Sequence, residues 1–286
     1  MLSNVYELAP AKLNLTLRVL PKRADGFHNI ESIFQKIRLC DELTVTRSAS
    51  AGCSLQVHGM ELPAENTVQK AFSLFAEVAE IREGIAVDLV KHIPSGAGMG
   101  GGSSDAAALL RALNSLFSAN VPQKVLVEIA EKIGSDVPFF LYGDCAIVSG
   151  RGEIVRPIEG RRDLYFVVIC PDVHSSTKEA YGLVDEWNMN NTVSKVEWPS
   201  LDELEGIYKK TADKWVFANS FTQPLISRYP EIQKALAAIT DVGADFADMT
   251  GSGSTVFGVF EAKQKAQDAY NRLASCFKRC YLCDAF

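Results

Sequence analysis

The sequence predicts an α+β fold in two domains. The first third of the chain reads as strands mixed with turns, and later segments place apolar residues near a 3.6-residue period, as amphipathic helices do. The C-terminal segment reads as strand, helix, strand, which is typical of an α+β sandwich. Composition changes near residues 152–163, so we expect an N-terminal domain over 1–158 and a C-terminal domain over 159–286.

The N-terminal domain is expected to combine strands with three helices. Ser103 or Ser104 is expected to cap the clearest helix, with Asp105 in its first turn. Gly134 is expected to end the helix that follows. The expected strands lie at 5–8, 13–19, 36–46, 54–58, 85–92 and 142–148, and the expected helices lie at 66–79, 103–116 and 123–133.

The C-terminal domain follows a predicted turn at 150–152. Its first strand is a continuous apolar run closed by Pro171. The expected strands lie at 164–170, 255–260 and 278–282, and the expected helices lie at 178–186, 201–208, 231–239 and 262–276.

Composition predicts an ordinary globular protein of the cytoplasm. The net charge of −6 argues against nucleic acid or an anionic membrane as the main partner. No apolar run reaches the ~18 residues of a membrane span, and the N-terminus lacks the features of a signal peptide. Seven cysteines without regular spacing suit a reducing compartment. We expect a monomer or a weak homodimer.

A glycine-rich run before a strong helix former is the most informative stretch. Five of the seven residues from 96 to 102 are glycine. Such a backbone can wrap its N–H groups around phosphate oxygens, and the helix N-terminus adds positive partial charge. The predicted phosphate-binding residues are Pro94, Ser95, Gly96, Ala97, Gly98, Met99, Gly100, Gly101, Gly102, Ser103 and Ser104.

Three other interpretations of this run are weaker. A Walker-type loop requires a lysine after its last glycine, and Ser103 stands there instead. A dinucleotide-binding fold requires an acidic residue about 20 positions on, at the end of a strand, and residues 116–120 contain none. A flexible turn does not usually concentrate five glycines against so regular a helix.

These residues resemble the GHMP family of small-molecule kinases. The family signature is matched by Pro94–Ala106, and further motifs of the family are matched, in order, by residues 9–15, 23–28, 133–140 and 249–254. The resemblance implies the two-domain GHMP kinase fold, with an N-terminal domain like domain 2 of a ribosomal protein and a ferredoxin-like C-terminal domain. It also implies a kinase that uses ATP and Mg²⁺.

Two residues stand on the catalytic positions of the family. Asp136 follows Gly134-Ser135 in a predicted turn, where an aspartate by itself favours a helix cap. Lys12 lies two residues before Asn14, so that both side chains share one face of a strand, although a solvated surface lysine is equally compatible with the pattern. The resemblance implies that Asp136 is the catalytic base and that Lys12 supports it.

The resemblance also implies a substrate with a cytosine base. Phe27 and His28 follow an Asp-Gly turn, so we expect both to be displayed, with the ring stacking on a base and the imidazole bonding its edge. Tyr181 is a candidate second wall, although it is also compatible with packing on a helix. The family more often has Tyr at the position of Phe27, which removes any hydrogen bond from that hydroxyl.

The remaining site predictions concern phosphates, adenine and metal. Gly251, Ser252 and Gly253 are expected to close over the substrate diphosphate, or else to form a tight turn before a strand. Asn14 is expected to bind substrate, and Asn66 is expected to lie near the adenine. Ser103 is a candidate Mg²⁺ ligand, and simple N-capping is the alternative.

Three functions remain open at this point. The first is phosphorylation of a hydroxyl on a cytidine diphosphate derivative of a sugar alcohol. The second is another GHMP activity, of the mevalonate or homoserine type, against which the Phe27-His28 pair argues. The third is a catalytically inactive binding protein, against which Lys12 and Asp136 argue. The C-terminal C-x₃-C-x₂-C spacing from Cys276 to Cys283 is more typical of incidental cysteines than of an iron–sulfur site.

Overall fold

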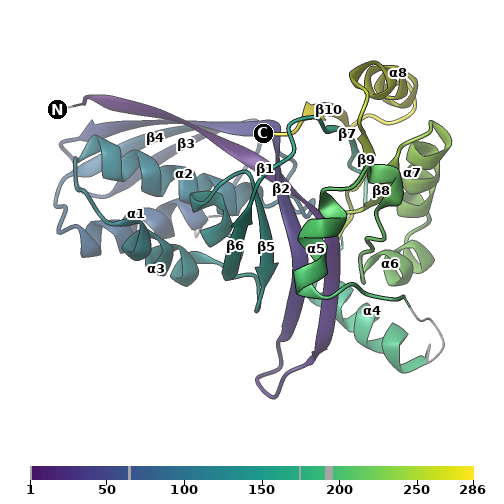
Figure 1. Ribbon diagram of the computed structural model, residues 1–286. Coiled ribbons are helices and arrows are strands. Elements are labelled where there is room, and N and C mark those ends of the chain that lie inside the picture. The colour runs from purple at the N-terminus through teal and green to yellow at the C-terminus, as the bar shows by residue number, and fades with distance from the viewer. Residues whose placement is uncertain (1, 64–65, 174, 191–195) are drawn as a thin grey trace. The chain divides into compact units, whose positions relative to one another are not determined.

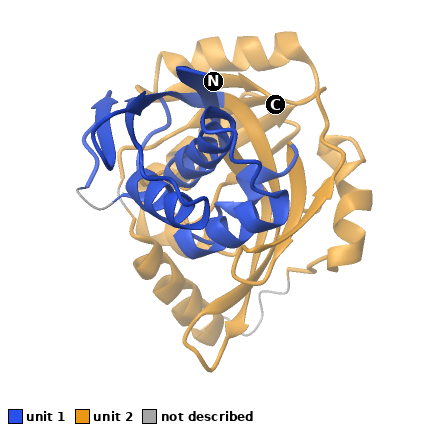
Figure 2. Cartoon of the chain, turned by 90° about the vertical axis from the view of Figure 1, so that its left-hand side faces the viewer, with its two compact units in different colours: residues 1–11, 39–95, 100–143 blue, residues 12–38, 96–99, 144–286 orange. Residues whose placement is uncertain are grey.

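A computed structural model describes residues 2–63, 66–173, 175–190 and 196–286. It divides into two compact units of non-contiguous segments (Figure 2). Unit 1 comprises Met1–Ala11, Leu39–Ser95 and Gly100–Gly143, and unit 2 comprises Lys12–Arg38, Gly96–Met99 and Asp144–Phe286. The long strands β1 (Asn4–Lys22) and β2 (His28–Ser48) contribute residues to both units. The division of the linear sequence near residue 158 stays a prediction.

Unit 1 consists of a sheet with its helices on one face (Figure 1). The end of β2 pairs antiparallel with β4, and β4 pairs in parallel with β3. In β4 the side chains of Ile85, Val87 and Leu89 are buried and those of Ala86 and Asp88 are exposed, so only one face of the strand is covered. The other elements of the unit are β3 (Cys53–His58), β4 (Gly84–Val90), α1 (Thr67–Val78), α2 (Gly101–Leu116), α3 (Gln123–Ile133) and the 3₁₀ helix η1 (Pro138–Leu141).

Unit 2 contains residues 12–22 of β1 and 28–38 of β2. There β2 pairs with β5, and β5 pairs with β6. The unit also contains a separate four-stranded antiparallel sheet. The order of that sheet, β10-β7-β9-β8, is the 4-1-3-2 order of a ferredoxin-like fold, with α7 and α8 packed on it (Figure 1). This confirms the ferredoxin-like topology. The strands are β5 (Cys145–Ser149), β6 (Ile154–Ile158), β7 (Tyr165–Ile169), β8 (Phe246–Met249), β9 (Val256–Phe260) and β10 (Cys280–Asp284).

The helices of unit 2 follow the predicted pattern closely. The predicted helix over 201–208 is confirmed at both ends, and in unit 1 the helix over 123–133 is confirmed in the same way. The helices of unit 2 are α4 (Thr177–Asn190), α5 (Leu201–Tyr208), α6 (Thr222–Arg228), α7 (Pro230–Asp241), α8 (Lys263–Ala274) and the 3₁₀ helix η2 (Ala212–Lys214).

Several predicted boundaries are wrong for identifiable reasons. The two strands predicted over 5–8 and 13–19 are one strand, β1, which runs through Pro10 and pairs with β2. The N-cap of α2 is Gly100 in a left-handed conformation, so Ser103, Ser104 and Asp105 lie inside the helix. The short elements β6, α6 and β8 were not predicted, since Pro157 and Pro224 interrupt the first two and β8 has only four residues.

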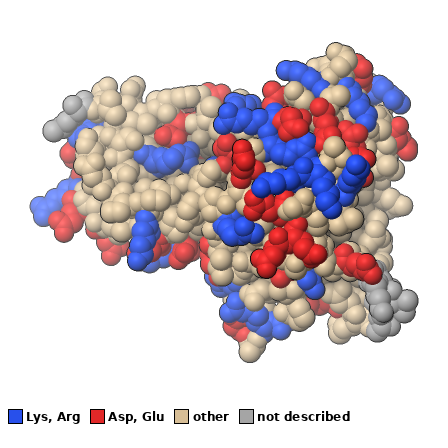
Figure 3. All heavy atoms as spheres, viewed as in Figure 1, with Lys and Arg blue, Asp and Glu red and all other residues tan. Residues whose placement is uncertain are grey.

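The surface carries mixed charge. On the face seen in Figure 3, Lys and Arg side chains are interspersed with Asp and Glu. Arg161, for example, contacts both Asp163 and Glu261. All seven cysteines are free thiols. Among the helices of the described residues, none combines the length and the apolar character of a membrane span.

A buried tyrosine joins three segments of unit 2. The Tyr208 hydroxyl donates to Gln35 Oε1 and accepts from the Arg161 backbone N–H, both at 2.7 Å. The ring is completely buried. Removing the hydroxyl leaves a buried amide oxygen and a backbone N–H without their partner, which is more costly than losing an exposed hydrogen bond.

We expect Tyr208→Phe to lower the free energy of unfolding by about 1–3 kcal/mol in urea titrations, because it leaves two buried polar groups unsatisfied. Tyr6→Phe is the matched control, since the Tyr6 hydroxyl bonds Glu42 at 2.8 Å on the surface. The control is expected to change stability much less, because Glu42, the partner of its hydroxyl, stays solvated after the substitution. Equal losses in the two variants would contradict this account.

Candidate functional site

The glycine-rich run alternates two kinds of residue. Gly96, Gly98 and Gly100 have φ angles of 67°, 75° and 73°, in the left-handed region that side chains disfavour. Ala97 and Met99 lie between them and are buried. The buried side chains of Ala97 and Met99 anchor the loop, while the backbone of the glycines stays partly exposed. Exposed glycine backbone of this kind forms anion-binding nests.

The late glycine stretch packs against this loop within unit 2. A Cβ atom at Gly98 would lie 2.6 Å from the Thr250 carbonyl oxygen, and one at Gly251 would lie 2.8 Å from the Gly98 carbonyl oxygen. Asn219 holds the turn by donating from Nδ2 to the carbonyls of Met249 at 2.7 Å and Gly251 at 2.9 Å. The stretch is therefore a turn before β9, as one alternative predicted, and it also contacts the first glycine loop.

Lys12 and Asn14 are connected to both glycine segments. The Lys12 Nζ donates to Asn14 Oδ1 at 2.5 Å, which confirms that the two side chains share one face. The Lys12 backbone N–H donates to the Met99 carbonyl at 2.9 Å, and the Asn14 N–H donates to Thr250 Oγ1 at 2.8 Å. Asn14 Nδ2 donates to Ser32 Oγ at 3.0 Å. Lys12 is only 3% exposed, so the interpretation as a solvated surface lysine is wrong.

Asp136 occupies a turn between α3 and η1. The residue after it, Val137, is the N-cap of η1, which begins at Pro138. Asp136 itself is half-buried. The predicted presentation of a carboxylate on a turn is thus confirmed. Asp136 belongs to unit 1 and Lys12 to unit 2, and their partnership in catalysis stays a prediction.

The predicted base-binding residues differ in exposure. Phe27 is 55% exposed, as expected, and the Arg151 guanidinium lies 4.8 Å from the centre of its ring. The prediction that His28 is displayed is wrong, because its ring is buried and its Nδ1 lies 2.8 Å from the Leu20 carbonyl oxygen. His28 stacks on Tyr181 with 5.1 Å between ring centres, so the structure brings these two predicted residues together.

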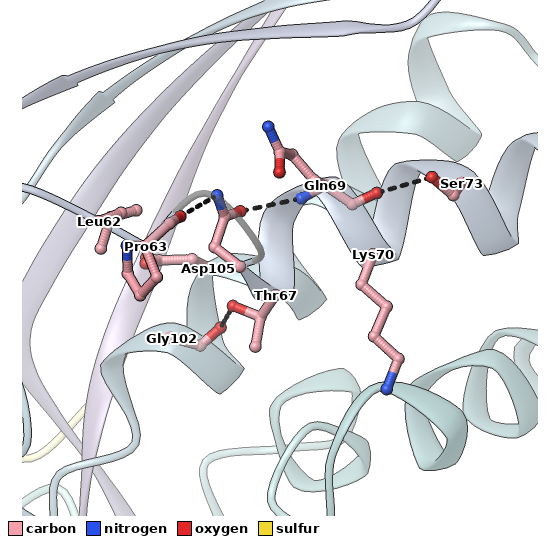
Figure 4. Close-up of a pocket in the computed structure, with 9 residues that line it drawn as sticks. Leu62, Pro63, Thr67, Gln69, Lys70, Ser73, Gly102 and Asp105 are labelled. Carbon is pink, nitrogen blue, oxygen red and sulfur yellow. Dashed lines mark hydrogen bonds between the residues drawn. The ribbon is translucent and has the colours of Figure 1, made fainter.

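A cavity of about 610 Å³ opens in unit 1 beside the start of α2. Asn66 caps α1, accepting from the Gln69 N–H at 3.0 Å and donating to the Pro63 carbonyl at 3.2 Å. Thr67 donates from Oγ1 to the Gly102 carbonyl at 2.6 Å, which joins α1 to α2 (Figure 4). The residues that line the cavity are Leu62, Pro63, Asn66, Thr67, Gln69, Lys70, Ser73, Gly102 and Asp105.

A buried cluster of charges beneath this cavity was not predicted. The Lys91 ammonium contacts the carboxylates of Asp41 and of Asp105, the latter at 2.6 Å. Asp41 Oδ1 also accepts from the backbone N–H groups of His92 and Ile93 at 2.6 and 2.8 Å. The signal in the sequence was an acid inside an otherwise apolar helical run. The cluster fixes the start of α2, the helix that follows the glycine loop.

Burial dominates the electrostatics of this cluster. It raises the pKa of Asp105 to about 7, against the opposing effect of Lys91, because water is excluded from the carboxylate. Among the described residues, Asp105 Oδ1 and the buried Ser104 Oγ have no hydrogen-bond partner. A carboxyl whose pKa is raised on folding stabilises the fold at low pH, and this stabilisation is lost as pH rises through about 7.

We expect Asp105→Asn to gain stability relative to the unsubstituted protein between pH 4 and pH 7.5. The amide mimics the protonated carboxyl and does not ionise. The unfolding free energy of Asp105→Asn should therefore rise relative to that of the unsubstituted protein by roughly 2–4 kcal/mol across this pH range. Urea titrations across this range measure it, and Glu77→Gln on the exposed side of α1 is the control. Parallel stability curves for Asp105→Asn and the unsubstituted protein would refute the raised pKa.

Family models match both halves of the chain. The model described as GHMP kinases N terminal domain matches residues 66–144, and the one described as GHMP kinases C terminal matches residues 204–279. These matches lie on either side of the predicted domain boundary.

Curated relatives and solved structures agree with the family models. A 4-diphosphocytidyl-2-C-methyl-D-erythritol kinase of Treponema pallidum (strain Nichols) is 38% identical over 93% of each chain. A relative from Streptococcus mutans, named as putative for the same enzyme, is 38% identical over 97% of this chain and 98% of its own. A crystal structure of 4-(cytidine 5'-diphospho)-2C-methyl-D-erythritol kinase aligns with a TM-score of 0.81 at 32% identity over 98% of both chains.

A homoserine kinase from Cytophaga hutchinsonii aligns with a TM-score of 0.76 at 19% identity, over 100% of this chain and 96% of its own, and shares the fold. The matches span nearly the whole chain and include both family models, as the sequence motifs predicted. The chain belongs to the GHMP kinase family.

Proposed function

We propose that this chain transfers the γ-phosphoryl group of ATP to the 2-hydroxyl of 4-diphosphocytidyl-2-C-methyl-D-erythritol, a step of non-mevalonate isoprenoid biosynthesis. The observation that carries the proposal is the similarity, at 38% identity over 93% of both chains, to a relative with that name. The buried Lys12–Asn14 pair, bonded to both glycine segments, supports it from the site.

The donor nucleotide is assigned to the glycine loop and the cavity of unit 1. Backbone N–H groups of residues 96–102, three of them in left-handed glycines, suit the β- and γ-phosphates. The cavity is within the size range of small-molecule sites and is lined by Asn66, which supports its assignment to the adenosine part of ATP.

Mg²⁺ fits the oxygen atoms near the start of α2. Ser103 and the unpartnered, buried Ser104 Oγ supply hard oxygen ligands, as Mg²⁺ prefers. Within the described residues no group of three His, Cys, Asp or Glu side chains is suited to a metal. Mg²⁺ would therefore take most of its ligands from nucleotide phosphates and water, and it would neutralise phosphate charge when bound.

The acceptor substrate is assigned to unit 2. Phe27 presents an exposed ring face, and the His28–Tyr181 stack provides a polar edge beside aromatic surface, which suits a pyrimidine. The turn of Gly251, Ser252 and Gly253 provides backbone for the diphosphate and adjoins the loop assigned to ATP. Asn14, held between Lys12 and Ser32, is assigned to substrate positioning.

Catalysis is assigned to Asp136 and Lys12. Phosphoryl transfer needs little covalent help, so the protein contributes mainly position and charge. Asp136 accepts the proton of the attacking hydroxyl. The Lys12 ammonium, buried and fixed by Asn14, stabilises negative charge that develops on that oxygen.

The alternative activities are less well supported. Solved mevalonate and homoserine kinases align at 13–19% identity, which shows a common fold and nothing about the acceptor. An ATP-consumption assay with the cytidine diphosphate substrate, mevalonate and homoserine separates them. We expect turnover with the first alone, and turnover with none would favour an inactive binding protein.

We expect Asp136→Asn to lower kcat about 10²–10⁴-fold, because the amide cannot accept a proton. Binding of a non-hydrolysable ATP analogue, measured by titration calorimetry, should be unchanged. Glu131→Gln, an exposed residue of α3, serves as the control and should keep full activity. Near-normal kcat in Asp136→Asn would remove Asp136 from the mechanism.

A further inference from the structure

A second pocket opens within unit 2. It has a volume of about 330 Å³, which lies in the size range of small-molecule sites. Residues of α4, α6, α7 and β8 line it, and these elements are neighbours, since α6 contacts α4 and α7, and α7 packs on β8 (Figure 1). The described residues that line it include none of those assigned above to ATP, the acceptor or catalysis. It is therefore a separate candidate site.

Asp248, near the end of β8, is the one charged side chain among the described residues that line this pocket. It is only 7% exposed. Its Oδ1 accepts from Thr222 Oγ1 at 2.5 Å and from the Met249 N–H at 2.7 Å. Both donors are neutral, and within the described part of the chain no cationic group pairs with Asp248. The carboxylate is thus held in one position, while no described residue balances its charge.

Burial makes this charge costly. It raises the pKa of Asp248 to about 6, although hydrogen bonds from Thr222, Met249 and Asn219 oppose the rise. Near neutral pH the carboxyl is therefore mainly ionised. A buried, ionised carboxylate is unfavourable unless a positive charge lies next to it. A cation in the pocket would supply that charge, whereas an anion would be repelled.

Two tryptophans line the same pocket. Trp187 belongs to α4 and Trp198 to the segment before α5, and both are half-buried. The face of an indole ring attracts a cation. Trp198 makes one such contact within the chain, because the Arg18 guanidinium lies 5.9 Å from the centre of its ring. Arg18 is itself paired with Glu31 at 3.1 Å, so its charge is balanced there.

The lining favours an organic cation over a metal ion. Mg²⁺ and Ca²⁺ require several oxygen ligands, and among the described residues no group of three His, Cys, Asp or Glu side chains could hold a metal. A primary ammonium needs an acceptor for each of its N–H groups. A methylated ammonium needs only a counter-charge and apolar or aromatic contact, and Val19, Leu236 and the two tryptophans provide that contact.

We propose that this pocket binds a small organic cation with a methylated ammonium group, for which the Trp187 and Trp198 rings provide the walls and Asp248 the counter-charge. The site goes beyond the phosphoryl transfer proposed above and does not depend on it. Recognition then rests on charge as well as on shape, so a neutral molecule of the same shape should bind poorly.

The experiment measures binding of choline by titration calorimetry near neutral pH. Neohexanol is its neutral analogue, in which a carbon atom replaces the ammonium nitrogen, and ethanolamine is the analogue without methyl groups. The proteins compared are the unsubstituted chain, Asp248→Asn, Trp198→Leu, Trp198→Phe and Asp241→Asn. Asp241, an exposed acid at the end of α7, is the matched control for the loss of a negative charge. Thermal melting verifies that each variant is folded.

We expect choline to bind the unsubstituted protein and Asp241→Asn saturably, and at least about tenfold more tightly than neohexanol. Ethanolamine should bind more weakly than choline. Asp248→Asn should weaken choline binding by at least about tenfold and leave neohexanol binding nearly unchanged, because the amide keeps the shape and the acceptor oxygen but removes the charge. Trp198→Leu should weaken choline binding roughly 2–30-fold, and Trp198→Phe, which keeps an aromatic face, should weaken it less.

Several results would overturn the inference. The first is no saturable binding of choline, which would leave Asp248 with its hydrogen bonds to Thr222 and Met249 alone. The others are equal affinities of the unsubstituted protein for choline and neohexanol, an equal loss of both ligands in Asp248→Asn, as a purely structural role would give, or tighter binding of ethanolamine than of choline. If Asp248→Asn does not fold, the choline and neohexanol affinities of the unsubstituted protein and of the Trp198 variants still test the site. None of these measurements uses ATP or a phosphoryl acceptor, so failure of the proposed function and failure of this inference are separate outcomes.

Discussion

The close approach of Gly98 to the backbone of Thr250 is the constraint on which the candidate site depends. No side chain fits between these segments, since a Cβ at Gly98 would lie 2.6 Å from a carbonyl oxygen. With the two turns in contact, the Met99 carbonyl accepts from Lys12 and the Thr250 hydroxyl accepts from Asn14. One backbone contact thus places the buried ammonium, its amide partner and two glycine loops together in unit 2.

A second set of buried polar groups fixes the other end of the glycine-rich loop. Lys91 with its two carboxylates lies where α2 begins, and Gly101 leaves room for the neighbouring Ile93 side chain, because a Cβ there would lie 3.1 Å from Ile93 Cγ2. Buried ion pairs add little net stability, but breaking them is costly, so they enforce one arrangement. In unit 1 this arrangement sets the position of the first turn of the helix on which the loop ends.

Local patterning was sufficient for the regular elements and insufficient for their junctions. The bounds of α3 and α5 were predictable because amphipathic spacing and end signals such as Gly134 agree there. The single strand β1, the start of α2 at Gly101 and the short β8 were not, since each depends on pairing or packing with distant segments. Likewise, the spacing of Lys12 and Asn14 predicted a shared face, but their burial depends on Ser32 and Thr250.

By itself, the sequence determined the family, and it identified the glycine-rich loop and the catalytic pair as candidates, because glycine spacing and residue order are properties of the chain. Only the tertiary structure decided that His28 is buried between Leu20, Tyr181 and Asp185, and that Lys91 gathers Asp41 and Asp105. The physical reason is the same in both cases. Whether a polar group is paired or exposed depends on partners far away in sequence, and folding alone brings them within hydrogen-bond distance.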